Sequence, residues 1–225
     1  MVNSRIYPRL SNMSGLIPFN HPSAILIAGP SFSGKTEFTK NLVTNRDEMF
    51  SVKPERVIWC YSHNQAAYRD LPSDVELCEG LFDLDSLDFS LPTLVIYDDM
   101  ADSDEAQKHI AKVFTMKCHH NNVTACFLTQ NIMPPNKYGR TISINAGYFV
   151  LMKSPRDKLQ VNCLARQIYP KRSAYFLEAY SDATSTPHGY LLVDFCQQTD
   201  ERYRLRTNIF PGNQTIVYVA KSILQ

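Results

Sequence analysis

Hydrophobic positions in this chain gather in short runs separated by polar, turn-rich segments. Residues 23–28, SAILIA, form an apolar run of strand length that ends at Gly29. Runs of the same kind are typical of strands that are buried on both faces of a parallel sheet. We predict a mainly parallel sheet of about five such strands. The predicted strands lie at residues 23–28, 56–61, 93–97, 123–128 and 148–152. Residues 190–195 and 202–205 predict a further C-terminal antiparallel pair.

The segments between these runs carry a helical period. Residues 35–46 place Phe38, Leu42 and Val43 on one side, which predicts an amphipathic helix. Residues 103–118 predict another, with Asp102 or Ser103 as N-cap and an inner face of Ala106, Ile110, Val113 and Phe114. Further helices are predicted at residues 155–168, opened by Pro155, and at residues 172–180.

Two segments lack a regular pattern. The stretch 74–88 is acidic and irregular, and residues 131–140 contain Pro134, Pro135 and Gly139, which predict an exposed loop. Alternating strands and helices indicate an α/β fold with a doubly wound, mainly parallel sheet flanked by helices. We expect a single domain over residues 1–225, with an N-terminal arm at 1–20 and a C-terminal tail at 206–225.

Composition is that of an ordinary globular protein, with 44% apolar and 20% charged residues. The net charge of +1 argues against a broadly basic surface, so any contact with nucleic acid is expected to be local. The six cysteines form no CxxC pair and are expected to be reduced thiols. No apolar stretch has the length of a membrane span and no signal peptide is recognised, so we expect a soluble, intracellular protein without membrane contact.

The first predicted strand leads into a phosphate-binding loop. Residues 29–36, Gly29-Pro30-Ser31-Phe32-Ser33-Gly34-Lys35-Thr36, match GxxxxGK[ST] and lie between a predicted strand and a predicted helix. Backbone N–H groups of such a loop bind phosphate oxygens. Lys35 is expected to reach the β and γ phosphates of ATP, and the Thr36 hydroxyl to bind Mg²⁺.

Two carboxylates follow the third predicted strand. Residues 94–97 deliver Asp98 and Asp99 to the carboxyl end of a central strand, where ligands bind in open α/β sheets. We interpret this as a Walker B strand, in which Asp98 holds the magnesium ion and Asp99 polarises the attacking water. The alternative is an acidic turn or helix cap. Gln130 ends the next predicted strand and is interpreted as a sensor of the γ-phosphate.

Other polar groups leave alternatives open. Cys118, His119, His120 and Cys126 do not have a usual zinc spacing, and a helix end with histidines near the negative dipole is favoured. Arg202, Arg204 and Arg206 would face one side of a strand, either as a solvated edge or as a contact with DNA or a neighbouring subunit. Lys137, Tyr138 and Arg140 raise the same choice.

The order of GPSFSGKT, LVIYDD, FLTQN, RTISIN, SPRD, LARQIYP and RLRTNIFP resembles the packaging ATPases of Polinton (Maverick) elements and related large DNA viruses, including the poxvirus type. That group lies within the FtsK/HerA superfamily of P-loop NTPases, and the resemblance covers residues 22–211. It implies a ring-forming motor, pentameric or hexameric, that drives double-stranded DNA into a preformed capsid. The implied partners are double-stranded DNA, further copies of the chain and a capsid or portal-vertex protein. The implied location is the cytoplasm or nucleus of a host cell, or the virion.

The resemblance assigns the same roles to Lys35, Thr36, Asp98, Asp99 and Gln130. It also implies an arginine finger from a neighbouring subunit. Arg140 is the first candidate for that finger, followed by Arg156 and Arg166.

Two residues depart from the family pattern. Phe32 stands where glycine is common, and Asp99 stands where many members have glutamate. The shorter aspartate requires the attacking water to sit closer.

Two other classes of P-loop protein, GTPases and nucleotide kinases, are disfavoured because the sequence lacks their motifs. The Asn136-Lys137 pair continues with Tyr138 and Gly139, so a GTPase NKxD motif is missing. The sequence also shows no arginine-rich lid, which argues against a nucleotide kinase. An ATP-gated DNA-binding scaffold and a helicase or conjugation-type motor remain open alternatives to the packaging motor.

Overall fold

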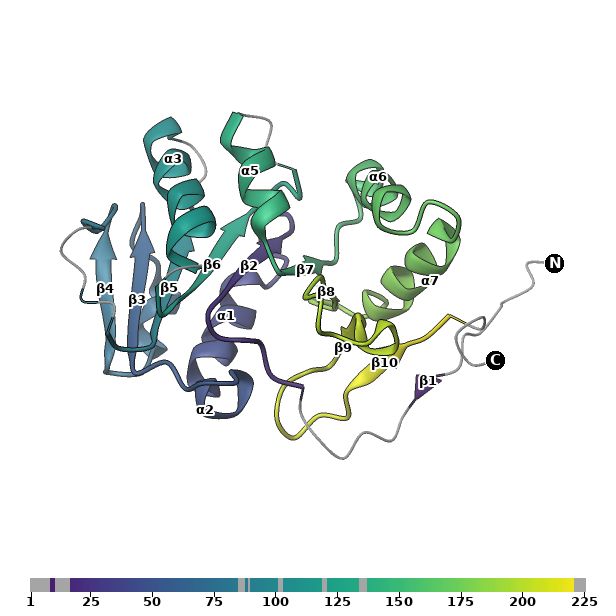
Figure 1. The fold of residues 1–225 in the computed structure, drawn as a ribbon, viewed down its shortest axis with the longest axis horizontal. Coiled ribbons are helices and arrows are strands. Elements are labelled where there is room, and N and C mark those ends of the chain that lie inside the picture. Colours follow the sequence, from purple (N-terminus) through teal and green to yellow (C-terminus); the bar gives the residue numbers. More distant parts are fainter. Residues whose placement is uncertain are drawn as a thin grey trace.

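One sheet runs through the whole molecule (Figure 1). The computed structural model describes residues 9–10, 17–84, 88, 90–100, 103–118, 121–133 and 137–220. The strands are β1 (Arg9–Leu10), β2 (Ser23–Ala28), β3 (Arg56–Tyr61), β4 (Val75–Glu79), β5 (Thr93–Asp98), β6 (Val123–Thr129), β7 (Tyr148–Met152), β8 (Tyr190–Asp194), β9 (Leu205–Thr207) and β10 (Ile216–Tyr218). They form a ten-stranded sheet in the order β1-β10-β9-β8-β7-β2-β6-β5-β3-β4.

The sheet has a parallel part and an antiparallel part. Strands β7, β2, β6, β5, β3 and β4 pair in parallel. Every residue of β5 and β6 is buried, as expected for strands covered on both faces. From β7 onward the pairing is antiparallel and adds β8, β9, β10 and β1, so this part is larger than the predicted strand pair. The predicted α/β class with a mainly parallel sheet is confirmed.

Helices cover both faces of the sheet. They are α1 (Lys35–Thr44), α2 (Arg46–Met49), the 3₁₀ helix η1 (Ala66–Asp70), α3 (Asp104–Lys112) with its π-helical continuation η2 (Val113–Lys117), α5 (Lys137–Asn145), α6 (Lys158–Ile168), α7 (Ser173–Ala183) and the 3₁₀ helix η3 (Glu201–Tyr203). Successive side chains of β2 alternate between the two buried clusters: Leu26 packs with residues of α3, α5, α6 and α7, and Ile27 with residues of α1 and α2. This is the doubly wound arrangement.

Two helix starts are fixed by side-chain caps. Ser103 accepts a hydrogen bond from the Ala106 N–H at 2.9 Å and caps α3, as one of the two predicted N-caps. Asp102, the other, lies outside the described residues. Helix α6 begins three residues beyond Pro155, because Asp157 caps it through the Gln160 N–H at 3.2 Å.

Three sequence predictions are wrong in part. The stretch 74–88 contains β4, an edge strand with mostly exposed or half-buried side chains. The predicted loop 131–140 gives way to α5 at Lys137, and Pro134 and Pro135 lie outside the described residues. The strand predicted at 202–205 begins only at Leu205, because η3 precedes it.

The segments predicted as an arm and a tail meet in the sheet. Strand β1 pairs antiparallel with β10, matching Arg9 with Tyr218 and Leu10 with Val217. None of the helices in the described part of the chain is long and apolar enough to cross a membrane.

Candidate active site

The loop between β2 and α1 is shaped by backbone conformations that few residues adopt. Phe32 and Gly34 have φ angles of 62° and 97°, in the left-handed region. A Cβ atom on Gly29 would lie 2.6 Å from the Cβ of Met152, so the loop can follow this path against β7 only with glycine there. The amides of the following residues lead into the N-terminus of α1, where backbone N–H groups attract anions.

Lys35 is the first residue of α1 and its side chain turns back onto the loop. Its Nζ donates hydrogen bonds to the carbonyl oxygens of Gly29 at 2.7 Å and Pro30 at 3.0 Å. Burial lowers the pKa of Lys35, and the charges of Asp98 and Asp99 oppose that shift. The ammonium group is therefore held between the loop and the carboxylates that follow β5.

Asp98 ends β5 and is buried, with 4% of its surface exposed. Its Oδ2 accepts hydrogen bonds from the Thr36 hydroxyl at 3.3 Å and the Tyr68 hydroxyl at 3.1 Å. Burial raises the pKa of Asp98, and these hydrogen bonds act in the opposite direction. Tyr68 lies on η1, a short helix that the hydrophobic pattern did not predict.

Thr36 and Asp98 form a pair of oxygen ligands suited to magnesium. Mg²⁺ in phosphate-transferring sites is bound by one or two protein oxygens, and substrate phosphates and waters supply the rest. Since Thr36 Oγ1 and Asp98 Oδ2 already lie 3.3 Å apart beside the phosphate-binding loop, these residues fit the ion. No group of three or more His, Cys, Asp or Glu side chains in the described ranges has the arrangement of a metal site.

Cys118, which follows η2, and Cys126, in β6, are poor metal ligands. Cys118 and Cys126 are buried, and burial raises the pKa of Cys118 to about 12 and that of Cys126 as well. Metals bind the thiolate, which burial disfavours here. His119 and His120 lie outside the described residues.

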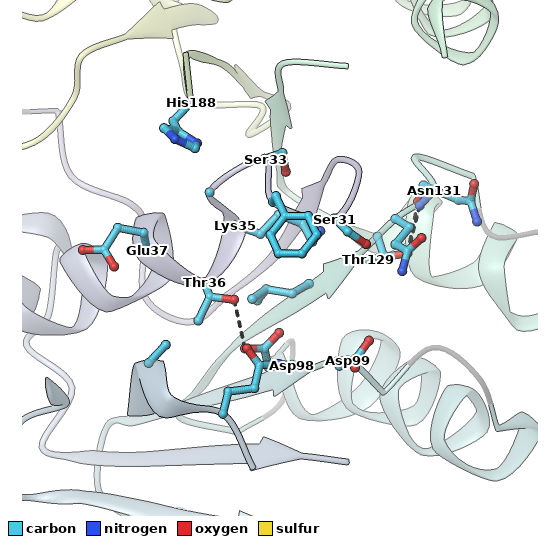
Figure 2. A pocket seen from close by; sticks show the side chains of 16 residues that line it. Ser31, Ser33, Lys35, Thr36, Glu37, Asp98, Asp99, Thr129, Asn131 and His188 are labelled. Carbon is cyan, nitrogen blue, oxygen red and sulfur yellow. Dashed lines mark hydrogen bonds between the residues drawn. The ribbon is translucent and has the colours of Figure 1, made fainter. Parts of the chain in front are cut away.

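Asp99 follows the last residue of β5, and its side chain has different surroundings from that of Asp98. Its φ of 57° turns the chain sharply, and its side chain is exposed. The Ser62 hydroxyl donates a hydrogen bond to the Asp99 carbonyl oxygen at 2.7 Å, which ties this turn to the end of β3. Figure 2 shows Asp98 next to Thr36, and Asp99 farther along the pocket toward Thr129 and Asn131.

Gln130 follows β6 on a segment anchored by α6. The Thr129 hydroxyl accepts a hydrogen bond from the Asn131 N–H at 3.2 Å, and the Gln160 amide donates to Asn131 Oδ1 at 3.2 Å. Gln160 also accepts from the Ile132 N–H at 2.9 Å. These bonds position the exposed Gln130 side chain at the pocket wall, while its sensor role stays a prediction. The sequence carried no signal for Gln160.

A single pocket of about 670 Å³ brings the predicted residues together. Its walls contain residues 31–36 of the phosphate-binding loop together with Asp98, Asp99 and Gln130, whereas Gly29 and Pro30 do not line it. The pocket is also lined by residues that sequence reasoning missed: Glu37, Gln65, Ala67, Leu128, Thr129, Asn131 and His188. Gln65 and His188 come from loops far away in sequence, which only the folded chain brings to the site.

The candidate arginine fingers lie elsewhere. Arg140, Arg156 and Arg166 are exposed and line no part of this pocket. Arg140 lies on α5 and lines a separate hollow of about 420 Å³ with Met133, Ser143, Ile144 and Gln167. A finger acting in a neighbouring subunit need not reach its own site, so this assignment stays a prediction.

Arg202, Arg204 and Arg206 do not lie on one face of a strand. The sequence interpretation, as a solvated edge or as a contact with DNA or a neighbouring subunit, had assumed that they do. Arg202 and Arg204 belong to the η3 region and pair with Asp200 and Glu201 at 2.9 and 2.6 Å. Arg206 is buried, with 1% exposed, and donates to Asp194 at 2.8 Å. Lys137 and Tyr138 open α5, with Lys137 Nζ 4.8 Å from the Tyr138 ring centroid.

No protein-family model and no curated protein sequence matches the chain. Among solved structures it is similar to ATPase domains 2 and 3 of EccC from Thermomonospora curvata in complex with a signal sequence peptide, with a TM-score of 0.50 and 10% identity over 88% of this chain and 36% of that one. It is also similar to the genome packaging NTPase B204 of Sulfolobus turreted icosahedral virus 2 in complex with ATP-gammaS, with a TM-score of 0.46 and 15% identity over 79% of this chain and 95% of that one. At such identities the likeness bears on the fold alone. Together with the match of residues 29–36 to GxxxxGK[ST], this likeness indicates that the chain has the fold of a P-loop NTPase.

Proposed function

We propose that this protein hydrolyses ATP in the pocket beside the phosphate-binding loop. The observation that carries the proposal is the meeting of Lys35, Thr36, Asp98, Asp99 and Gln130 on the walls of one cavity. Five separate segments supply the lining: the β2–α1 loop with the start of α1, the ends of β5 and β6, the β3–η1 connection, and the α7–β8 turn that carries His188. An accidental glycine turn or an acidic helix cap would not require this convergence.

Each residue has a task that follows from its position. Backbone N–H groups of the loop and of α1 bind the phosphates, and Lys35 exchanges its bonds to Gly29 and Pro30 for phosphate oxygens. Thr36 and Asp98 would hold Mg²⁺, which would neutralise phosphate charge. Asp99 accepts the proton of the attacking water, and the Gln130 amide orients that water.

The finer proposal is a packaging motor of the FtsK/HerA superfamily, of Polinton or poxvirus type. It works as a ring of identical subunits that moves double-stranded viral DNA into a capsid inside the host cell. This proposal is supported by the order of motifs from GPSFSGKT to RLRTNIFP in the sequence. The fold by itself does not determine what is transported, since the structure of the EccC domains of similar fold is of a complex with a signal sequence peptide.

DNA-stimulated turnover tests the motor proposal. Steady-state ATP hydrolysis is measured with and without long double-stranded DNA, at several protein concentrations, with Asp99→Asn as the blank. A motor predicts a rate per subunit that rises with both DNA and protein concentration, because the site is completed by assembly on the substrate. An ATP hydrolysis rate that is the same with and without DNA would contradict the motor proposal and favour the ATP-gated scaffold.

A further inference from the structure

Different residues lie at the two sides of the candidate active site, with Glu37 and His188 on one side and Asp99 on the other in Figure 2. Asp99 and Gln130 mark one side, where the γ-phosphate of ATP is attacked in the proposed function. Thr36 and Lys35 lie between the sides, and Glu37 with His188 marks the other side (Figure 2). A nucleotide whose triphosphate lies along the loop therefore directs its base and ribose toward His188.

His188 is held by a tightly packed turn between α7 and β8. Its φ is 58°, and the next residue, Gly189, is pinned by hydrogen bonds at both ends: its N–H donates to Thr186 at 3.2 Å and its carbonyl accepts from Lys153 at 2.9 Å. A Cβ atom on Gly189 would lie 2.5 Å from the Ala183 carbonyl oxygen, so this turn needs glycine there. The position of His188 is therefore set by the backbone.

The imidazole of His188 lies against the phosphate-binding loop. A Cβ atom on Gly34 would approach His188 Nδ1 to 3.1 Å and its Cβ to 3.2 Å, so the ring occupies the space that glycine leaves open. The rest of the side chain is exposed to the pocket. Within the described part of the chain, the imidazole makes no hydrogen bond that would give it a structural task.

We propose that His188 is the base-contacting residue of this site, where its imidazole packs flat against the purine ring of the bound nucleotide. The proposal rests on the proposed nucleotide-binding function and adds the residue that recognises the nucleoside part. Planar aromatic side chains bind bases through their π-faces, and such stacking changes affinity substantially for each base. An exposed ring fixed beside the α1 N-terminus, opposite the catalytic carboxylates, has the position that this contact requires.

Three ligands and two variants test the contact in the full chain. Binding of ATP, ribose 5-triphosphate and inorganic triphosphate is measured by calorimetry for the wild type, His188→Asn and His188→Phe. Asparagine tolerates the left-handed backbone but lacks an aromatic ring, and phenylalanine restores the ring. Thermal unfolding of each variant checks that the fold is retained.

Stacking predicts that His188→Asn weakens ATP binding about tenfold while ribose 5-triphosphate and inorganic triphosphate bind as to the wild type. His188→Phe should bind ATP with nearly the wild-type affinity. Unchanged ATP binding in His188→Asn, or an equal loss for all three ligands, would overturn the base contact and leave the proposed ATPase standing. Failure of the wild type to bind ATP and inorganic triphosphate would overturn both.

Discussion

Asp98 shares one carboxylate oxygen between two hydroxyl donors. Thr36 belongs to the phosphate-binding loop, whereas Tyr68 approaches from η1 and packs against Trp59, with ring centroids 5.6 Å apart. Groups that hydrogen-bond to a metal ligand orient it and tune its affinity for the ion. In the proposed site, where Asp98 is the magnesium ligand, Tyr68 is a positioning residue for it.

Tyr68→Phe should raise the magnesium concentration that gives half-maximal ATP hydrolysis by about tenfold, because Asp98 loses an orienting hydrogen bond. Titration of magnesium at saturating ATP measures this change. Tyr61→Phe is the matched control, since the Tyr61 ring lies tilted against Tyr68, with centroids 5.3 Å apart, and the hydroxyl that bonds to Asp98 is that of Tyr68. Equal magnesium dependence in Tyr68→Phe and the wild type would contradict the positioning role.

Burial of Asp98 also makes a prediction about pH. Its pKa is raised in the folded protein, so between about pH 4, where an unfolded aspartate titrates, and that raised pKa the folded state binds more protons. The contribution of Asp98 to the free energy of unfolding therefore falls as pH rises through this window. Asp98→Asn removes the titration. The Tm of the wild type minus that of the variant should be larger at about pH 4 than at about pH 7, and the opposite trend would contradict the assignment.

At the scale of elements, a buried ion pair joins β8 to β9. Asp194 and Arg206 expose 2% and 1% of their surfaces, and Asp194 also accepts hydrogen bonds from the Cys196 N–H and the Thr199 hydroxyl. The pair belongs to the antiparallel strands that extend the sheet beyond β7. Removing one partner leaves an uncompensated charge in the interior.

Arg206→Met should lower the free energy of unfolding by about 3 kcal/mol, measured by denaturant titration. Arg202→Met is the control, because Arg202 pairs with Asp200 at an exposed position and its loss should change stability little. If both variants unfolded at the wild-type denaturant concentration, the ion pair would not be the element that joins β8 to β9.

The strands of the parallel sheet could be predicted because their residues are buried on both faces. β2, β3 and β7 begin and end as the apolar runs do. Strand β4 was missed because an edge strand buries few side chains, so its sequence VELCE has the pattern of an acidic loop. Helix α5 was missed because it follows a proline pair and buries few residues, namely Gly139 and Ile142, so its hydrophobic pattern is weak.

The residues of the candidate site also fall into a predictable and an unpredictable group. The phosphate-binding loop, Asp98 and Asp99 belong to short local motifs that can be recognised from the sequence. Tyr68, Gln160 and His188 act through contacts made only after folding, such as the bond from Tyr68 to Asp98 across 30 positions of sequence. No periodicity or motif marks such residues. Arg206 was misread for the same reason, because its burial depends on Asp194 in the neighbouring strand.

At the scale of the whole molecule, the proposed ring motor requires an arginine from a neighbouring copy, and no arginine of the described residues lines the pocket. Arg140→Ala should bind ATP normally and hydrolyse it at least a hundredfold more slowly, since a finger stabilises developing phosphate charge. Lys35→Ala cannot bind nucleotide but still carries Arg140. A mixture of the two inactive variants should therefore recover hydrolysis in mixed oligomers. Wild-type turnover by Arg140→Ala alone would move the finger to Arg156 or Arg166.

In the proposed function, Asp99 is the carboxylate that activates water in the ATP-binding pocket. The most direct test is Asp99→Asn, measured for ATP affinity and for hydrolysis of bound ATP in a single turnover. Asparagine suits the left-handed φ of 57° at this position, so the turn is preserved while the base is lost. Near wild-type affinity with hydrolysis slowed about a hundredfold or more is predicted, with Lys35→Ala as the variant that loses binding. Full turnover by Asp99→Asn would contradict the account.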